Sequence, residues 1–505
     1  MIDLFRSKFK HIIALLLLLL CLKSSGQETF FTFFPNPLNA YFGDMIEDEY
    51  GNYLAVGQQR IFNDFSTNRG TLWRITSQGD TLSKNFSHGG DTSTGFINVL
   101  HTDNHYCTII GGITLHQQQN FNYLMILHID SSLNVVEKKF IAPSGTTGAS
   151  AQLVEKSMGN YYCVGNSINL DGVVQHSIMK LNNTFDIIGF QTYSFNSNGI
   201  FTGSFTDVII SPDSTQLWAF GYNLTPDDQS NCDMVVFDTL LNFVEIKPFP
   251  FGEFPYWSQF DDDLTVRFIS DSTFLVGGQF WYQNYPDPAQ VDIGFCKFDS
   301  SLVFKPVTVF GAIDTIDNSA FKRTFDFVSI DSIFFTGMKR TGGGLYPSSP
   351  SWIHVGLINN DLNPYYERYY GGDAFYWVNS ILATSDGGAL IAGNRYDYLT
   401  QGYERDAFFL KVNSDGLVTS SIHEPYCPYL PFSVYPNPGN GYPLIHLALR
   451  NAFLRVYNIT GQMVLSFPIK EGANQVDFSR LPNGSYILSI IDQNGEVFST
   501  KWIKN

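Results

Sequence analysis

The chain is poor in basic residues: 30 lysines and arginines stand against 47 aspartates and glutamates, which gives a net charge of −17 at neutral pH. Such an excess of negative charge repels nucleic acid and anionic lipid, so neither is an expected partner. The six cysteines are few and widely spaced, which argues against a disulfide framework. Cys107 and Cys163, in equivalent positions of neighbouring repeats, are expected to be buried thiols rather than a pair.

Recognisable catalytic motifs are also missing. The sequence has no HExxH, no paired CxxC, no GxSxG, no P-loop and no GxGxxG. These absences argue against zinc hydrolases, nucleophile-elbow esterases and nucleotide-binding folds. The paired carboxylates of a glycosidase remain possible, because their separation in space rather than in sequence defines them.

The first residues have the pattern of a secretory signal peptide. Arg6, Lys8 and Lys10 form a basic start, residues 12–20 are apolar, and small residues at 24–26 offer a cleavage site. The apolar run is short for a membrane span, so we expect none in the mature chain. Removal of residues 1–26 takes away four basic residues and one acidic residue, which brings the net charge to −20.

Internal repetition is the strongest signal in the body of the chain. Seven segments each contain an apolar strand, a polar turn and a second apolar strand that ends in glycine. The spacings between these glycines are 54, 54, 56, 56, 60 and 56 residues. The closing glycines are Gly57, Gly111, Gly165, Gly221, Gly277, Gly337 and Gly393.

Each repeat continues with a third strand, a turn that begins with a polar residue (Asp or Asn in six repeats), and a fourth strand. Four antiparallel strands in about 55 residues form one propeller blade, so residues 27–423 predict an all-β, seven-bladed β-propeller. The last repeat has a weak fourth strand, and residues 28–34 are expected to replace it and close the ring. The alternative fold is an open β-solenoid. The seventh repeat, with its Asp-Gly-Gly turn, resembles the repeat propellers of secreted Bacteroidetes proteins.

Polar residues near the start of each innermost strand predict a ring at one mouth of the channel. Their carboxylate and amide oxygens are the ligands that calcium prefers, and calcium is the one cofactor that the sequence suggests. The alternative is that these side chains bond to neighbouring blades or to channel water. The ring consists of Asp44, Asn98, Gln152, Asp207, Asp263, Asp326 and Asn379, of which the four aspartates are the candidate metal ligands.

Aromatic residues mixed with amides occupy the loops that are expected on one face of the propeller. Flat rings beside amides suit sugar rings or peptide strands, which have an apolar face and polar edges. The alternative is that these rings fill gaps between blades. The candidate ligand-binding residues are Trp257, Trp281, Tyr282, Tyr285, Trp352, Trp377 and Tyr396.

The amino-acid composition and the net charge of the chain change near residue 425. Residues 424–431 form a proline-rich linker, and residues 432–505 have a net charge of +2, whereas residues 27–431 carry −22. Alternating strands joined by Asn-Gly turns predict a small Ig-like β-sandwich in this tail.

Short motifs in the tail resemble the type A C-terminal sorting domain of the type IX secretion system. They are Tyr435, Pro436, Asn437 and Pro438; Gly461; Gly484 and Tyr486; and Lys501 and Lys504 near the end. The resemblance implies contact with the type IX secretion machinery, export through the periplasm, and a final location at the cell surface or outside the cell.

Three functions remain open. The leading hypothesis is a non-enzymatic binding or adhesion protein whose aromatic face captures an extracellular glycan or protein. The alternatives are a secreted polysaccharide hydrolase or lyase and a structural surface-layer component. Paired carboxylates in a concave pocket would favour the enzyme, and an aromatic platform would favour binding.

Overall fold

The structure is a computed structural model with two compact units, residues 1–420 and 421–505. The predicted signal peptide at 1–26 and the linker at 424–431 lie outside the described residues. No helix in the described part of the chain is long and apolar enough to cross a membrane. The structure describes residues 28–34, 38–61, 64–86, 92–102, 105–115, 121–157, 159–172, 174–193, 204–224, 230–248, 259–260, 264–282, 290–299, 306–312, 315–341, 347–400, 404–418, 432–435, 439–458, 462–492 and 497–504.

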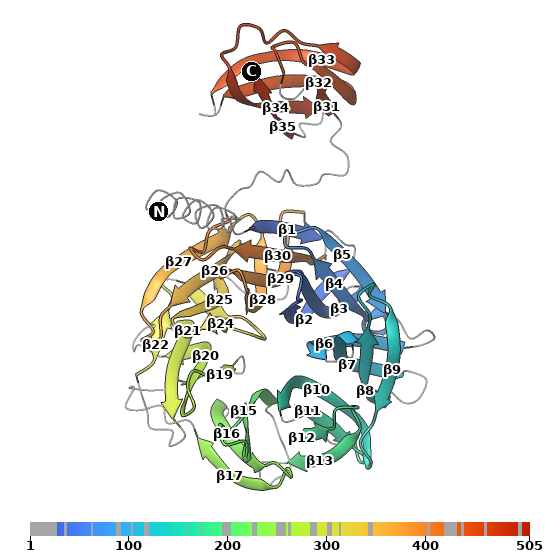
Figure 1. Cartoon of the computed structure of the whole chain (residues 1–505), viewed down its shortest axis with the longest axis vertical. Helices are drawn as coiled ribbons and strands as arrows, with labels where there is room; N and C mark the ends of the chain where they lie inside the picture. The colour runs from blue at the N-terminus through green and yellow to red at the C-terminus, as the bar shows by residue number, and fades with distance from the viewer. Residues whose placement is uncertain are drawn as a thin grey trace, which may run out of the picture. The chain divides into compact units, whose positions relative to one another are not determined.

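The first unit is a ring of antiparallel strand groups, which we call blades and number from the N-terminus (Figure 1). Blade 1 contains β2 (Asn39–Glu47), β3 (Tyr53–Arg60), β4 (Arg69–Ile75) and β5 (Thr81–Phe86), with a short 3-10 helix, η1 (Phe65–Thr67). Blade 2 contains β6 (Thr92–Thr102), β7 (His105–Leu115), β8 (Phe121–Ile129) and β9 (Val135–Ile141). Blade 3 contains β10 (Thr146–Ser157), β11 (Asn160–Asn169), β12 (Val174–Leu181) and β13 (Ile187–Tyr193).

Blades 4 to 7 continue the ring, and two of them have a divided innermost strand. Blade 4 contains β14 (Ser204–Ile210), β15 (Gln216–Leu224), β16 (Ser230–Asp238) and β17 (Phe243–Pro248). Blade 5 contains β18 (Gln259–Phe260) and β19 (Thr265–Phe268), followed by β20 (Thr273–Tyr282), β21 (Gln290–Asp299) and β22 (Thr308–Phe310). Blade 6 contains β23 (Ile316–Ser319) and β24 (Phe325–Ser329), followed by β25 (Ser332–Arg340), β26 (Ser351–Ile358) and β27 (Pro364–Gly371). Blade 7 contains β28 (Phe375–Ala383), β29 (Ala389–Tyr396), β30 (Asp406–Val412) and β1 (Phe30–Phe34). The all-β propeller fold predicted from the sequence is confirmed.

The hydrophobic core lies between blades. Leu54, Val56 and Leu72 of blade 1 share a buried cluster with Phe96 and Ile109 of blade 2. Equivalent clusters join each following pair of blades, and one joins blade 7 to blade 1. Since each blade buries its faces against two neighbours, the blades stabilise one another only as a ring.

The ring closes where the two ends of the body meet. β1 pairs antiparallel with β30, in a register that places Phe30 opposite Lys411 and Phe34 opposite Ala407. Phe30 is buried in the cluster that joins blades 7 and 1. The prediction that residues 28–34 complete the seventh repeat is confirmed, and the pairing removes two exposed strand edges.

The closing glycines of the repeats are explained by a close approach of backbones. A Cβ atom would lie 2.0 Å from the Tyr41 carbonyl oxygen at Gly57, and 2.0 Å from the Trp377 carbonyl oxygen at Gly393. The cause is a register shift opposite each glycine, between Phe42 and Met45 in blade 1 and between Val378 and Ser380 in blade 7. The shift is a β-bulge that turns a carbonyl of the innermost strand onto the glycine, and only glycine leaves room for it.

The turn between the third and fourth strands also follows one plan. The Asp130 carboxylate accepts hydrogen bonds from the backbone N–H groups of Ser132 and Asn134. The strained residue is Leu133, whose φ is 61° and whose side chain is buried. Phe185, Leu241 and Leu362 repeat this arrangement. Burial of the apolar side chain offsets the cost of left-handed backbone, about 1 kcal/mol.

Cys107 and Cys163 are both buried, in the clusters of blades 1 and 2 and of blades 2 and 3 respectively, and they are not joined. Burial raises the pKa of each thiol to about 12. These thiols therefore pack as small apolar groups.

The second unit is the tail. Its sheet contains β31 (Phe432–Tyr435), β32 (Leu444–Asn458), β33 (Met463–Gln475), β34 (Gly484–Asp492) and β35 (Val497–Lys504). The first part of β32 pairs with β31 and its last part pairs with β34, on either side of a register shift between Leu447 and Asn451. The long strand therefore serves two parts of the sheet, which share a core built around Phe478, Leu488 and Trp502.

Candidate functional site

The described aromatic candidates lie at the strand ends that face one side of the propeller. Trp281 is near the end of β20 and pairs with Gln259, and Trp352 is near the start of β26. Both are half-buried. Trp257 and Tyr285 lie outside the described residues, and Tyr282 is described by its backbone alone.

The two aromatic candidates of blade 7 have structural contacts. The Arg405 guanidinium lies over the Trp377 ring, 4.0 Å from its centroid, and Trp377 packs against the cluster of blades 6 and 7. Tyr396 is buried in that cluster, with an exposed fraction of 4%. Gap filling, the alternative that the sequence left open, therefore describes the contacts of Trp377 and Tyr396. Binding at Trp281 and Trp352 stays a prediction.

Asp44 of the predicted polar ring lies at the bulge of its innermost strand and not at the strand start, whereas Asp326 is the second residue of β24. β2 begins at Asn39, five residues before Asp44, because the bulge lets the strand continue past it. Asp44 Oδ1 accepts a hydrogen bond from Arg323 at 2.5 Å, and Asp326 lies 3.8 Å from the same guanidinium.

Asp207, a buried member of the ring, also contacts the next blade. Asp207 Oδ2 accepts hydrogen bonds from the Val266 N–H at 2.6 Å and from Arg267 at 3.0 Å. Burial raises the pKa of Asp207, against the effect of Arg267. Asp263 lies outside the described residues. Within the described ranges, no group of three or more Asp, Glu, His or Cys residues could hold a metal ion. Calcium binding by the ring stays a prediction.

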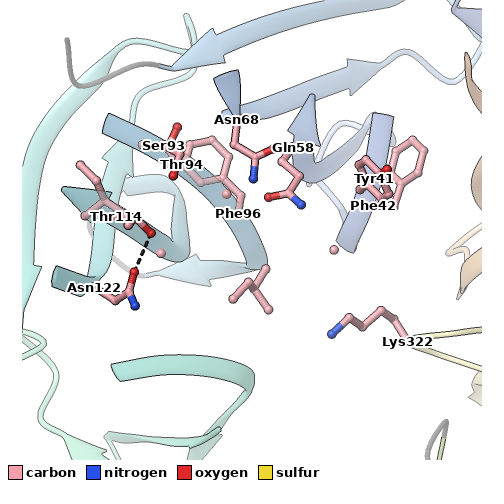
Figure 2. Close-up of a pocket in the computed structure, with 15 residues that line it drawn as sticks. Tyr41, Phe42, Gln58, Asn68, Ser93, Thr94, Phe96, Thr114, Asn122 and Lys322 are labelled. Atoms are coloured by element: carbon pink, nitrogen blue, oxygen red, sulfur yellow. Dashed lines mark hydrogen bonds between the residues drawn. The ribbon is translucent and has the colours of Figure 1, made fainter. Parts of the chain in front are cut away.

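A pocket of about 460 Å³ opens between blades 1 and 2 (Figure 2). Blade 1 contributes residues of β2 and β3 and the residue before β4, and blade 2 contributes residues of β6, β7 and β8. Its volume lies in the range of small-ligand sites, about 300–1,000 Å³. The lining residues are Tyr41, Phe42, Gly43, Gln58, Asn68, Ser93, Thr94, Gly95, Phe96, Ile97, Gly112, Ile113, Thr114, Asn122 and Lys322.

Hydroxyls and amides supply most of the polar lining, beside aromatic rings such as Tyr41 and Phe96. Thr114 donates a hydrogen bond to Asn122 Oδ1 at 2.6 Å, which fixes the orientation of that amide. The Arg60 guanidinium lies 4.5 Å from the centroid of the Tyr41 ring and donates a hydrogen bond to its hydroxyl. Among the described residues that line the pocket, none has a carboxylate or an imidazole, the usual general acids and bases of hydrolysis.

Lys322 also lines this pocket, although it belongs to blade 6. Figure 2 shows its side chain extending toward the residues of blades 1 and 2. Lys322 belongs to residues 320–324, which separate β23 from β24. Its backbone N–H donates to the Asn379 carbonyl of blade 7 at 2.8 Å.

Sequence reasoning missed every lining residue of the pocket. The polar ring and the aromatic loops were sought within single repeats, whereas the pocket combines two repeats with a residue of a third. One signal was available: the longest glycine interval, 60 residues, ends at Gly337 of blade 6. That blade carries the insertion at 320–324, and the repeat pattern predicts an innermost strand that begins near Asp326, after β23.

The motif residues of the tail hold its turns together. The Lys504 ammonium is buried and donates to the Ser479 and Leu481 carbonyls at 2.7 and 2.6 Å. The Tyr486 hydroxyl donates to the Pro482 carbonyl at 2.6 Å. Gly484 has a φ of 156°, at the start of β34, and Tyr435 ends β31. The other motif positions, Pro436 to Pro438 and Gly461, lie outside the described residues, as does the side chain of Lys501.

Residues 433–505 match the family described as the secretion system C-terminal sorting domain. The tail is therefore the sorting domain that its motifs predicted, and the protein is exported to the cell surface or the extracellular space by the type IX secretion system. No curated protein matches the chain.

Solved structures with a similar fold include the β-propeller domain of the trilobed protease from Pyrococcus furiosus, with 8% identity, a TM-score of 0.39, and coverage of 74% of this chain and 95% of that one. The extracellular domain of a putative hybrid two-component system from B. thetaiotaomicron has 12% identity, a TM-score of 0.37, and coverage of 95% and 59%. The α-L-arabinofuranosidase of Fusarium graminearum has 10% identity, a TM-score of 0.40, and coverage of 78% and 99%. These overall similarities are low, and the fold assignment rests on the strand pairing of the chain itself.

Proposed function

We propose that this exported protein is a non-enzymatic carbohydrate-binding protein, and that its ligand occupies the pocket between blades 1 and 2. The observation that carries the proposal is the lining of that pocket. Hydroxyl, amide and aromatic groups surround about 460 Å³, and the described lining has no carboxylate or imidazole. Sugars match such a lining, since they combine hydroxyl edges with an apolar ring face.

Hydrogen bonds between blades 1 and 2 that hold the lining of the pocket in place also support the proposal. Thr94 is buried, accepts a hydrogen bond from the Gly70 N–H at 2.8 Å and donates to the Phe86 carbonyl at 3.0 Å. β4 and β5 of blade 1 are therefore tied to β6 of blade 2, so the two blades form one continuous wall of the pocket. A rigid wall lowers the entropy cost of binding.

The test is a glycan-array screen of the purified chain, followed by calorimetry with the best ligand. Gln58→Ala and Asn68→Ala, which remove lining amides, are each expected to weaken binding ~3–10-fold, the effect of one lost hydrogen bond. Gln78→Ala is the matched control, since Gln78 is exposed in the turn between β4 and β5 of the same blade. Unchanged affinity in both pocket variants would contradict the proposal, and hydrolysis of the bound sugar would favour the enzyme.

A further inference from the structure

We infer that the pocket selects an N-acetylated amino sugar, whose acetamido group occupies the place of a side chain that blade 2 lacks at Gly112. This inference rests on the proposed carbohydrate site and names its ligand class. Gly112 lines the pocket, and a Cβ atom added there would have no described atom within 4 Å. The pocket therefore reaches the backbone of β7 at this point, where any other residue would fill part of it.

Gly112 directly follows a closing glycine, a position at which other repeats have an amide side chain. In blade 7, Asn394 Nδ2 donates a hydrogen bond to the Ala40 carbonyl, in the innermost strand of blade 1, at 2.6 Å. In blade 1, the Gln58 carboxamide lies against Gly95, in the innermost strand of blade 2, since a Cβ atom at Gly95 would overlap Gln58 Oε1. The blade plan thus places a carboxamide at this position, and glycine leaves its space to the ligand in blade 2. The amides that directly follow a closing glycine are Gln58, Asn166 and Asn394.

The cross-strand partner of Gly112 is Gly95, a second glycine. In blade 1 the corresponding pair is Tyr41 with Gln58, so blade 2 lacks an aromatic ring as well as an amide. The Cβ positions of directly opposite residues lie on one face of the sheet, about 4.5–5.5 Å apart. Because Gln58 of blade 1 covers Gly95, a group that occupies the space at Gly112 lies next to the Gln58 carboxamide.

A second amide of the pocket has a buried atom that needs a donor. Asn68 Oδ1 is buried and has no hydrogen-bond partner in the described part of the chain. Asn68 stands two residues before Gly70, the strand partner of Gln58, so the two amides are neighbours (Figure 2). The Asn68 carbonyl accepts a hydrogen bond from the Thr94 N–H at 2.9 Å, which fixes the backbone of this residue. A ligand N–H at this place satisfies an acceptor whose burial is otherwise destabilising.

An acetamido group matches this part of the pocket in shape and in hydrogen bonding. It is a planar amide with the donors and acceptors of the Asn and Gln side chains that other repeats have at this position. Its N–H can donate to Asn68 Oδ1, its carbonyl can accept from the Gln58 amide, and its methyl group fills the space at Gly112. A sugar hydroxyl can donate to Asn68 but is too small to fill that space, so the pocket discriminates between the two sugars.

The test compares matched sugars by calorimetry on the whole chain. N,N′-diacetylchitobiose is paired with cellobiose, and N-acetyllactosamine with lactose, since within each pair acetamido replaces hydroxyl. The wild-type chain is expected to bind the N-acetylated member of at least one pair about tenfold more tightly, the gain from one or two further hydrogen bonds. Chitobiose, which has free amino groups in place of acetamido groups, is expected to lack this gain. Binding of chitobiose as tight as that of its diacetyl form would show that charge is recognised and would overturn the inference.

Gly112→Asn gives blade 2 the carboxamide that blade 7 has at Asn394. It is expected to remove the preference, with about a tenfold loss for the N-acetylated sugar and less than about a threefold change for its partner. Gly112→Ala adds only a methyl group and is expected to weaken binding of the N-acetylated sugar about threefold. Gly172→Asn is the matched control, because Gly172 is exposed in a turn of blade 3, no described atom lies within 4 Å of its Cβ position, and Asn tolerates its φ of 80°.

Thermal unfolding shows whether each variant is folded. If Gly112→Asn is not, the wild-type comparison and Gly112→Ala decide the question. Equal binding within both pairs by the wild type, or an intact preference in a folded Gly112→Asn, overturns the inference. The carbohydrate site still stands in that case if Gln58→Ala weakens binding of the sugar without the acetamido group. Absence of binding by every sugar overturns the carbohydrate site as well.

Discussion

Blades 6 and 7 share one hydrophobic cluster, yet each departs from the common blade plan in a different strand. In blade 6 the innermost strand is divided, and residues 320–324 extend from it toward blades 7 and 1. In blade 7 the innermost strand has only a bulge, but the outermost strand comes from the opposite end of the body. The divided innermost strand of blade 6 adds one residue, Lys322, to the lining of the pocket, whereas the outermost strand of blade 7 closes the ring.

The largest expected effect concerns the closure of blade 7. Phe30→Ala removes a buried ring from the cluster that joins blades 7 and 1, and we expect it to lower the free energy of unfolding by about 4 kcal/mol. Phe33→Ala on the same strand is the control, because Phe33 is 37% exposed and its loss is expected to cost less than about 1 kcal/mol. Urea unfolding of both variants measures the difference. Equal losses would mean that the pairing of β1, and not its buried side chain, closes the ring.

The next effect compares the closing glycines of the two blades. Gly393→Ala places a Cβ 2.0 Å from the Trp377 carbonyl oxygen, and Gly337→Ala places one 2.1 Å from the Asn318 carbonyl oxygen. Each is expected to cost about 3 kcal/mol, since the innermost backbone must move. Gly112→Ala is the control: its Cβ meets nothing within 4 Å, and the expected change is within about 1 kcal/mol. A much smaller cost at Gly337, measured by thermal unfolding, would show that the divided strand of blade 6 yields where the bulge of blade 7 does not.

The smallest effect concerns the ion pair that fixes the insertion of blade 6. Arg323 and Asp44 have side-chain exposures of 17% and 12%, so Arg323→Gln is expected to cost about 2 kcal/mol. The exposed pair of Lys247 and Glu245 provides the control, and Glu245→Gln is expected to cost less than about 0.5 kcal/mol. A double-mutant cycle with Asp44→Asn measures the coupling directly. Coupling near zero would contradict a fixed insertion.

The repeat of the propeller could be predicted because its period depends on a local requirement. A glycine must stand wherever a bulged carbonyl approaches, as at Gly57 and Gly393, and the sequence displays that glycine at regular spacing. The fourth strand of blade 7 could also be predicted, because the last repeat has only a weak fourth strand of its own. The sorting domain was predictable from motifs, such as Tyr486 and Lys504, whose hydrogen bonds hold its turns.

The pocket could not be predicted, because its residues come together only when the ring closes. Gln58, Asn122 and Lys322 belong to three different blades and share no spacing in the sequence. The division of β23 from β24 was missed for another reason. Residues 317–319 of β23 are polar although they are buried, so this strand lacks the apolar alternation that marks a strand in the sequence. Apolar patterning also cannot separate a ring that fills a gap, such as Tyr396, from one that faces solvent.

The pairing of β1 with β30 also determines when the ring can close during folding. Among the strands of the body, β1 is synthesised first and β30 last, so β1 has no partner until residues 406–412 exist. The strands of blades 1 to 6 can pair with neighbours made shortly before them, whereas closure must wait for the whole body. Ring closure is therefore expected to be the last step of folding, and the strand nearest the N-terminus stays an open edge for longest.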